Sequence, residues 1–166
     1  MSGWMCETVF AHLTVADDGT ASGRFLEDSL YFMTARSHLP PPRPPLRKGI
    51  GNARESRIDP AILQCGTALW VAQLAAPQTQ VAWGENVTFL IDASTGSRVE
   101  ARPDPAGGWT VLQHGPTRMW DEIEKAIETW QEAGQPHQSG FGLTVTPESP
   151  WVWLGDPDGP TWNLPA

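Results

Sequence analysis

The chain has 166 residues, a net charge of -8 and 40% hydrophobic residues, with nine tryptophans. This length suits one domain with at most a small appendage, and the tryptophans can supply much of a core. The overall negative charge argues against nonspecific binding to nucleic acid. No apolar run approaches the ~20 residues that a membrane-spanning helix needs, and the first residues lack a signal-peptide pattern. We therefore expect a cytoplasmic protein without a membrane or nucleic-acid partner.

The first ordered element predicted is a β-hairpin over residues 7–27. Two runs of strand-forming residues flank the turn sequence DDGT, in which Gly19 suits a positive φ. A third apolar run, at 30–36, also has the length of a strand.

A proline- and arginine-rich segment at 37–57 then interrupts the pattern. It has too few apolar residues to fold alone, so we expect a flexible arm on a single domain of residues 1–166. Glu55 is its one acidic residue. Such an arm could attract an acidic peptide. The basic side chains that we predict to bind the peptide are Arg43, Arg47, Lys48, Arg54 and Arg57.

Two helices and further hairpins follow the arm. Asp59 and Pro60 predict a short helix at about 60–66, while the next residues, 67–76, fit either a helix or a strand. Alternating patterns with central turns predict hairpins over 79–93 and 97–114. Pro116 and Gly134 bound the longest predicted helix, at about 116–134.

The long helix is amphipathic, and its apolar stripe comprises Met119, Trp120, Ile123, Ile127 and Trp130. Its acidic residues predict a solvated opposite face. A last hairpin occupies 140–154. The elements together predict an α+β fold with an antiparallel sheet of hairpins. We expect the first strands and the last hairpin to share that sheet, with the helix stripe packed on its face.

The sequence has no glycine-rich phosphate loop, and its histidines and two cysteines lack metal-binding spacing. We predict no cofactor and no metal. His114, just before the long helix, and Asp121 are the candidates for acid–base catalysis, the alternative being that His114 only bonds the backbone at the helix entry. Trp151 and Trp153 alternate along the last strand and fit either the core or the lining of a peptide groove.

Four stretches carry a family resemblance: DGTASGRF, the FM of LYFMTAR, GPTRMWDEIEKA and FGLTVTPESPWVWLGDP. They resemble the C-terminal extension of actinobacterial enzymes similar to protein-L-isoaspartate O-methyltransferase. Those enzymes accompany gene clusters for ribosomally made peptides such as graspetides and lanthipeptides, where they methylate an aspartate side chain. The resemblance covers the chain from about residue 9 onward, and its last 50 residues are the most specific.

The chain departs from this family because the half that binds S-adenosylmethionine is absent, so no catalytic or cofactor-binding residue carries over. The resemblance implies a detached domain that recognises a precursor peptide or docks a separate catalytic subunit. Two alternatives are a small cyclase, hydrolase or isomerase derived from that domain, and a fragment of a longer protein. An unpaired strand at residues 1–8 would pair with a second copy or with a partner.

Overall fold

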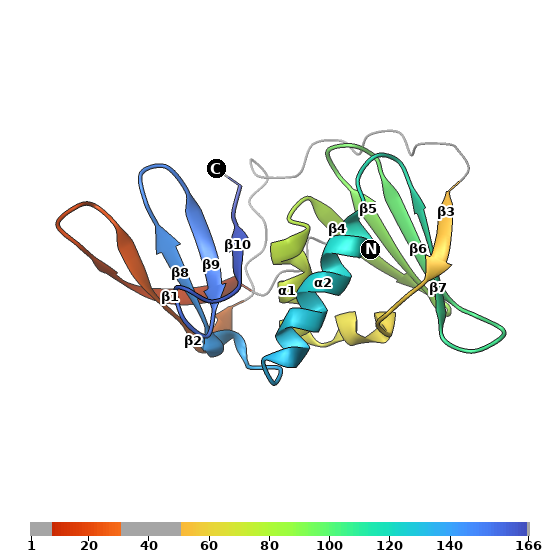
Figure 1. Ribbon diagram of the computed structural model, residues 1–166, viewed down its shortest axis with the longest axis horizontal. Coiled ribbons are helices and arrows are strands. Elements are labelled where there is room, and N and C mark those ends of the chain that lie inside the picture. Colours follow the sequence, from red (N-terminus) through yellow and green to blue (C-terminus); the bar gives the residue numbers. More distant parts are fainter. Residues whose placement is uncertain (1–7, 31–50, 166) are drawn as a thin grey trace. The chain divides into compact units, whose positions relative to one another are not determined.

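The computed structural model describes residues 8–30 and 51–165, and these belong to two compact units (Figure 1). The described part of the first unit is 51–127, and that of the second is 8–30 with 128–165. Two five-stranded antiparallel sheets and two α-helices in this part of the chain confirm the α+β prediction. The sequence predicted one sheet, and the structure has one in each unit.

The sheet of the first unit has the strand order β3-β7-β6-β5-β4. The two hairpins predicted between 79 and 114 are confirmed as a four-stranded meander. The turn between its first two strands has Asn86 at a φ of 55°. The bounds of the meander strands are β4 (Thr79–Gly84), β5 (Val87–Asp92), β6 (Arg98–Pro103) and β7 (Trp109–His114).

The strand β3 (Asn52–Glu55) lies at the edge of this sheet and pairs antiparallel with β7. We predicted these residues as part of a flexible arm. They are instead a strand, because β7 supplies the ladder partner and Arg54 is held by side chains of a helix. The segment 37–50 of the predicted arm lies outside the described residues.

Helices cover one face of the first unit's sheet (Figure 1). A short 3-10 helix, η2 (Pro60–Gln64), precedes α1 (Gly66–Ala75). The sequence of 67–76 fitted either a helix or a strand, and α1 shows that this segment is helical. The long helix α2 is Met119–Glu132. Under the helices, the sheet buries Leu90, Val99, Ala101 and Val111 completely. Trp120, Ile123 and Ile127 of α2 are also 0–1% exposed.

This packing corrects one expectation. The start of α2 contacts the sheet of the meander, through the hydrogen bonds between Gln113 of β7 and residues Trp120 and Asp121. We had expected the helix on the sheet of the first and last strands. Only the residues of α2 from Glu128 onward belong to the second unit.

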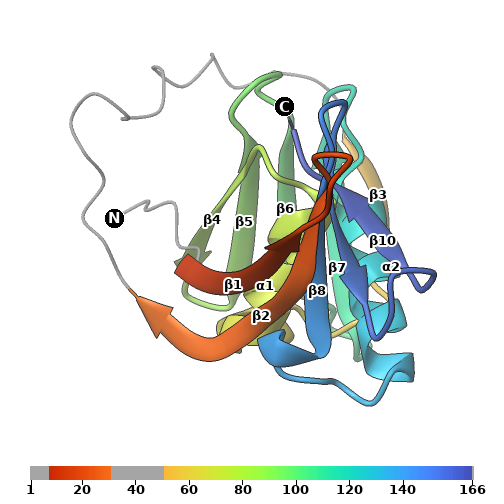
Figure 2. The same cartoon turned by 90° about the vertical axis from the view of Figure 1, so that its left-hand side faces the viewer.

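The second unit contains a sheet of order β1-β2-β8-β9-β10 (Figure 2). The predicted sharing of one sheet by the first hairpin and the last is therefore confirmed. One face carries the buried Phe25, Phe141, Val152 and Leu154, and Trp162 packs its ring 6.0 Å from Phe141. The elements are β1 (Thr8–Val15), β2 (Ala21–Leu30), η3 (Gln138–Gly140), β8 (Phe141–Val145), β9 (Pro150–Leu154) and β10 (Thr161–Asn163).

None of the helices between residues 51 and 165, or elsewhere in the described chain, is long and apolar enough to cross a bilayer.

Candidate functional site

Arg54 of β3 forms ion pairs with two carboxylates of α2. Its Nε lies 3.2 Å from Asp121 Oδ1, which Nη2 also contacts. Its Nη1 and Nη2 donate to Glu124 Oε1 and Oε2 at 3.0 and 2.6 Å. The guanidinium therefore attaches the edge strand to the helix through a fork of charge-assisted hydrogen bonds.

Glu124 is completely buried, and polar groups surround it. Besides Arg54, its Oε1 accepts from the Ser56 hydroxyl at 3.1 Å, the Arg57 amide at 2.9 Å and the Trp120 indole at 2.9 Å. Burial raises the pKa of this carboxyl, but the bonds from Arg54 and the Arg57 amide outweigh burial and leave the pKa below its ordinary value. Glu124 is thus an ionised structural centre, although the sequence placed it on a solvated face.

Gln113 connects this network to the start of α2. Its side-chain oxygen accepts the Trp120 backbone N–H at 3.1 Å, and its nitrogen donates to Asp121 Oδ1 at 2.8 Å. Burial opposes ionisation of Asp121, yet the bonds from Arg54 and Gln113 lower the pKa of its carboxyl. A carboxylate held in this way is a weak base, so its position does not favour the catalytic role that we predicted for it.

His114, the other predicted catalytic residue, lies on the opposite face of the sheet from Asp121. Successive side chains of a strand alternate between faces, and the neighbouring Gln113 points toward α2. A Cβ added to Gly51 would lie 2.7 Å from His114 Cε1, so the imidazole packs against that segment. The structure does not bring His114 and Asp121 together.

The basic residues that we predicted to bind a peptide fall into two groups. Arg43, Arg47 and Lys48 lie outside the described residues. Arg57 is 54% exposed and lies 3.4 Å from Glu124 Oε2, whereas Arg54 is only 33% exposed. Arg54 and Arg57 therefore belong to the structural network around Glu124. The described part of the chain does not test the predicted roles of Arg43, Arg47 and Lys48.

Trp153 is buried in the second unit, while Trp151 is half-buried on the same strand. The indole of Trp153 lies across Gly142, where an added Cβ would come within 2.0 Å of its Cζ2. Its Nε1 donates to Thr144 Oγ1 at 3.1 Å, and Arg24 covers the ring at 4.6 Å from its centroid. Trp153 thus packs within its own sheet and offers no open ring for a peptide.

The outer edge of β3 is unpaired among the described residues. Ser56 N donates to Trp109 O at 2.7 Å, and bonding alternates along an antiparallel pair. The backbone groups of Ala53 and Glu55 consequently point away from β7, and of these the Glu55 carbonyl accepts a hydrogen bond from Arg54 Nη1 at 2.9 Å. Beside them lies a hollow of about 490 Å³. Its lining residues are Ala53, Arg54, Glu55, Asp104, Ala106, Gly107 and Thr110.

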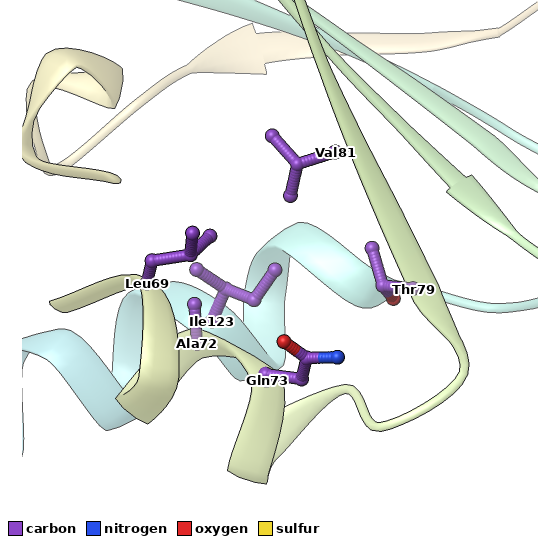
Figure 3. Close-up of a pocket in the computed structure, with 6 residues that line it drawn as sticks. All are labelled: Leu69, Ala72, Gln73, Thr79, Val81 and Ile123. Carbon is purple, nitrogen blue, oxygen red and sulfur yellow. The ribbon is translucent and has the colours of Figure 1, made fainter. Parts of the chain in front are cut away.

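A second cavity, between α1, α2 and β4, is much smaller (Figure 3). Its volume of about 10 Å³ holds roughly one water molecule, so it cannot admit a peptide side chain. Leu69, Ala72, Val81 and Ile123 make most of its wall apolar, with Gln73 and Thr79 completing it. This cavity is a packing feature.

The sequence did not identify Gln113, Ser56 and Glu124 as members of the network around Arg54. It also did not identify Asp104 as a residue that lines the hollow beside β3. One signal was present: Trp120 and Glu124 are four residues apart, which puts the carboxylate beside the apolar stripe. No group of three or more histidine, cysteine or acidic side chains suited to a metal occurs within residues 8–30 and 51–165.

β1 is an edge strand of the second unit's described sheet. We predicted that a strand at residues 1–8 pairs with a second copy or a partner. Residues 1–7 lie outside the described residues, and Thr8 is the first residue of β1.

No family model matches the chain, and neither the curated proteins nor the solved structures yield a match to it.

Proposed function

We propose that this chain recognises a peptide, or docks a separate catalytic subunit, during the modification of ribosomally made peptides in the cytoplasm. One observation carries this proposal: the edge of β3 is unpaired in the described part of the chain and adjoins an open hollow of about 490 Å³. An extended segment can add to such an edge through main-chain hydrogen bonds, with a side chain in the adjoining hollow.

The biological setting of the proposal comes from the sequence resemblance to the methyltransferase extension. In that setting a detached domain would hold the peptide while a separate protein supplies the chemistry. We propose no binding of S-adenosylmethionine by this domain, because the resemblance does not include the half of those enzymes that binds it.

The enzyme alternative depends on His114 and Asp121 acting together. The two side chains lie on opposite faces of the sheet, and Asp121 is bound by Arg54 and Gln113. This arrangement favours recognition over catalysis by that pair.

Calorimetric titration tests the proposal. The protein is titrated with precursor peptides of graspetide and lanthipeptide type, and separately with S-adenosylmethionine. We expect heat from a peptide and none from the cofactor. Heat from the cofactor would contradict the proposal, and binding of no peptide would reject peptide recognition and leave only the docking of a catalytic subunit. His114→Ala should leave peptide affinity unchanged, and conversion of a bound peptide that depends on His114 would support the enzyme alternative instead.

A further inference from the structure

The turn between β6 and β7 holds the carboxylate of Asp104 beside the edge of β3. Asp104 accepts hydrogen bonds from the Ala106 amide at 2.8 Å and the Thr110 hydroxyl at 2.6 Å. These two bonds lower the pKa of the Asp104 carboxyl. Gly107 and Gly108, at φ values of 105° and 77°, close the turn. The position and the negative charge of Asp104 are therefore set before any ligand arrives.

Glu55 supplies a second carboxylate to the same hollow. A Cβ added to Gly108 would lie 3.6 Å from Glu55 Oε1, so this side chain reaches across to the turn. Glu55 is exposed, and neither it nor Asp104 has an ion-pair partner among residues 51–127 or elsewhere in the described chain. The hollow thus has two carboxylates whose charge no described side chain compensates.

Two arginines near the hollow already have partners. The Arg54 guanidinium bonds Asp121 and Glu124, and its Nη1 also donates to the Glu55 carbonyl at 2.9 Å. Arg54 also lines the hollow. Arg102 is paired in register with Thr110, but its Nη2 donates to Glu100 Oε2 at 2.5 Å. Among the described residues that line the hollow, the charges without an ion-pair partner are consequently negative, in contrast to the positive charge counted along 37–57.

We propose that the edge of β3 binds an extended peptide segment that carries a lysine or arginine. The peptide backbone pairs with the outward N–H and C=O of Ala53 and with the outward N–H of Glu55, and the cationic side chain enters the hollow between Glu55 and Asp104. This inference rests on the proposed peptide recognition and gives it a site and a ligand class. It reverses the expectation that an acidic peptide is the partner, since the complementary charge here is positive.

Labelled peptides of alternating threonine and valine residues test the site by fluorescence anisotropy. The central residue is lysine in one peptide, uncharged norleucine in the second and glutamate in the third. We expect the lysine peptide to bind about 3–10-fold more tightly than the norleucine peptide, and the glutamate peptide to bind most weakly. The lysine preference should shrink as salt is raised, because the carboxylates lie near solvent.

The variant Glu55→Gln/Asp104→Asn is the matched test of charge. Asparagine keeps an oxygen for the Ala106 amide, so the turn is retained while both negative charges are removed. We expect the preference for lysine to vanish and the affinity for the norleucine peptide to stay unchanged. A lysine preference that survives in this variant would overturn the inference.

Ala53→Pro tests the backbone pairing, because it removes an outward N–H from an edge strand that tolerates proline. We expect a loss of about tenfold or more for every peptide. If this variant does not fold, amide exchange of the unmodified protein decides: the Ala53 and Glu55 amides must gain protection when the lysine peptide binds. Unchanged exchange at both would refute the site.

The outcomes separate this inference from the proposed function. Preferential binding of the glutamate peptide, or binding that Ala53→Pro leaves intact, would reject the β3 site while peptide recognition stands. If neither these peptides nor the precursor peptides bind, both the site and the proposed peptide recognition fail.

Discussion

Replacing Glu124 with glutamine tests whether the buried carboxylate holds β3 and α2 together. Oε1 accepts four hydrogen bonds, from Arg54, Ser56, Arg57 and Trp120. Oε2 faces Arg54 Nη2 at 2.6 Å. Glutamine has one acceptor oxygen, so one of these two positions would hold an amide nitrogen that points at donors.

The expected loss of stability is about 2–4 kcal/mol. Removing one partner of a buried ion pair costs roughly 3–5 kcal/mol, because the other charge stays buried without compensation. Arg54 is 33% exposed and keeps Asp121, which lowers the estimate to about 2–4 kcal/mol. Glu122→Gln is the matched control, since the same chemical change on the same helix affects an exposed side chain and should cost about 0.5 kcal/mol or less.

The assay is urea unfolding at neutral pH, followed through the Trp120 indole N–H in nitrogen–proton correlation spectra. This probe is local to the network, because the indole donates to Glu124 Oε1 at 2.9 Å. A loss in Glu124→Gln no larger than that in Glu122→Gln would refute the reasoning.

The same comparison has a defined pH dependence. The pKa of Glu124 is lower in the folded protein than its unfolded value of about 4.3. Its ionised form therefore contributes its full stabilisation above that unfolded value. The contribution falls as the pH drops through the lowered folded pKa. The difference between wild type and Glu124→Gln should accordingly be constant near neutral pH and shrink below about pH 4. A difference that grows on acidification would contradict the assignment.

Four further substitutions test packing by thermal and urea unfolding. Gly142→Ala should cost about 1–3 kcal/mol, since its Cβ would come within 2.0 Å of the Trp153 ring, and wild-type stability would contradict that contact. Trp153→Phe should cost about 1–3 kcal/mol, because it loses the bond to Thr144 and part of the buried ring. Ile123→Val should cost about 0.5–1.5 kcal/mol by enlarging the small cavity, and adding Val81→Ile should restore part of the loss; additive destabilisation would show that the two side chains do not share it.

The hairpins were predictable because they are local. Alternating residues around short turns specify β4 with β5 and β6 with β7 whatever surrounds them, and the structure has these pairs in register. Which hairpins share a sheet depends on contacts between distant residues. The division into two sheets therefore had no local signal.

Two elements, α1 and β3, lack the residue pattern by which a helix or a strand is recognised in a sequence. In α1, Ala68, Trp70, Val71 and Leu74 are all buried, so the segment lacks a polar face and shows no helical period. In β3 the exposure is the opposite, since three of its four residues are exposed and Arg54 is half-buried. A polar edge strand has no alternation to detect, and its pairing with β7 and the anchoring of Arg54 become visible only in three dimensions.

At the edge of β3, the charge counted from the sequence differs from the charge that lacks an ion-pair partner in the structure. Six of the eleven basic residues lie between residues 36 and 58, so composition predicts a surface for an acidic peptide. Arg54 belongs to that count, yet two carboxylates of α2 bind it. Glu55 and Asp104 have no such partners in the described chain, and they face the hollow beside the strand. Because a ligand responds to the charges that remain uncompensated, the edge of β3 should attract a cation although it follows a basic segment.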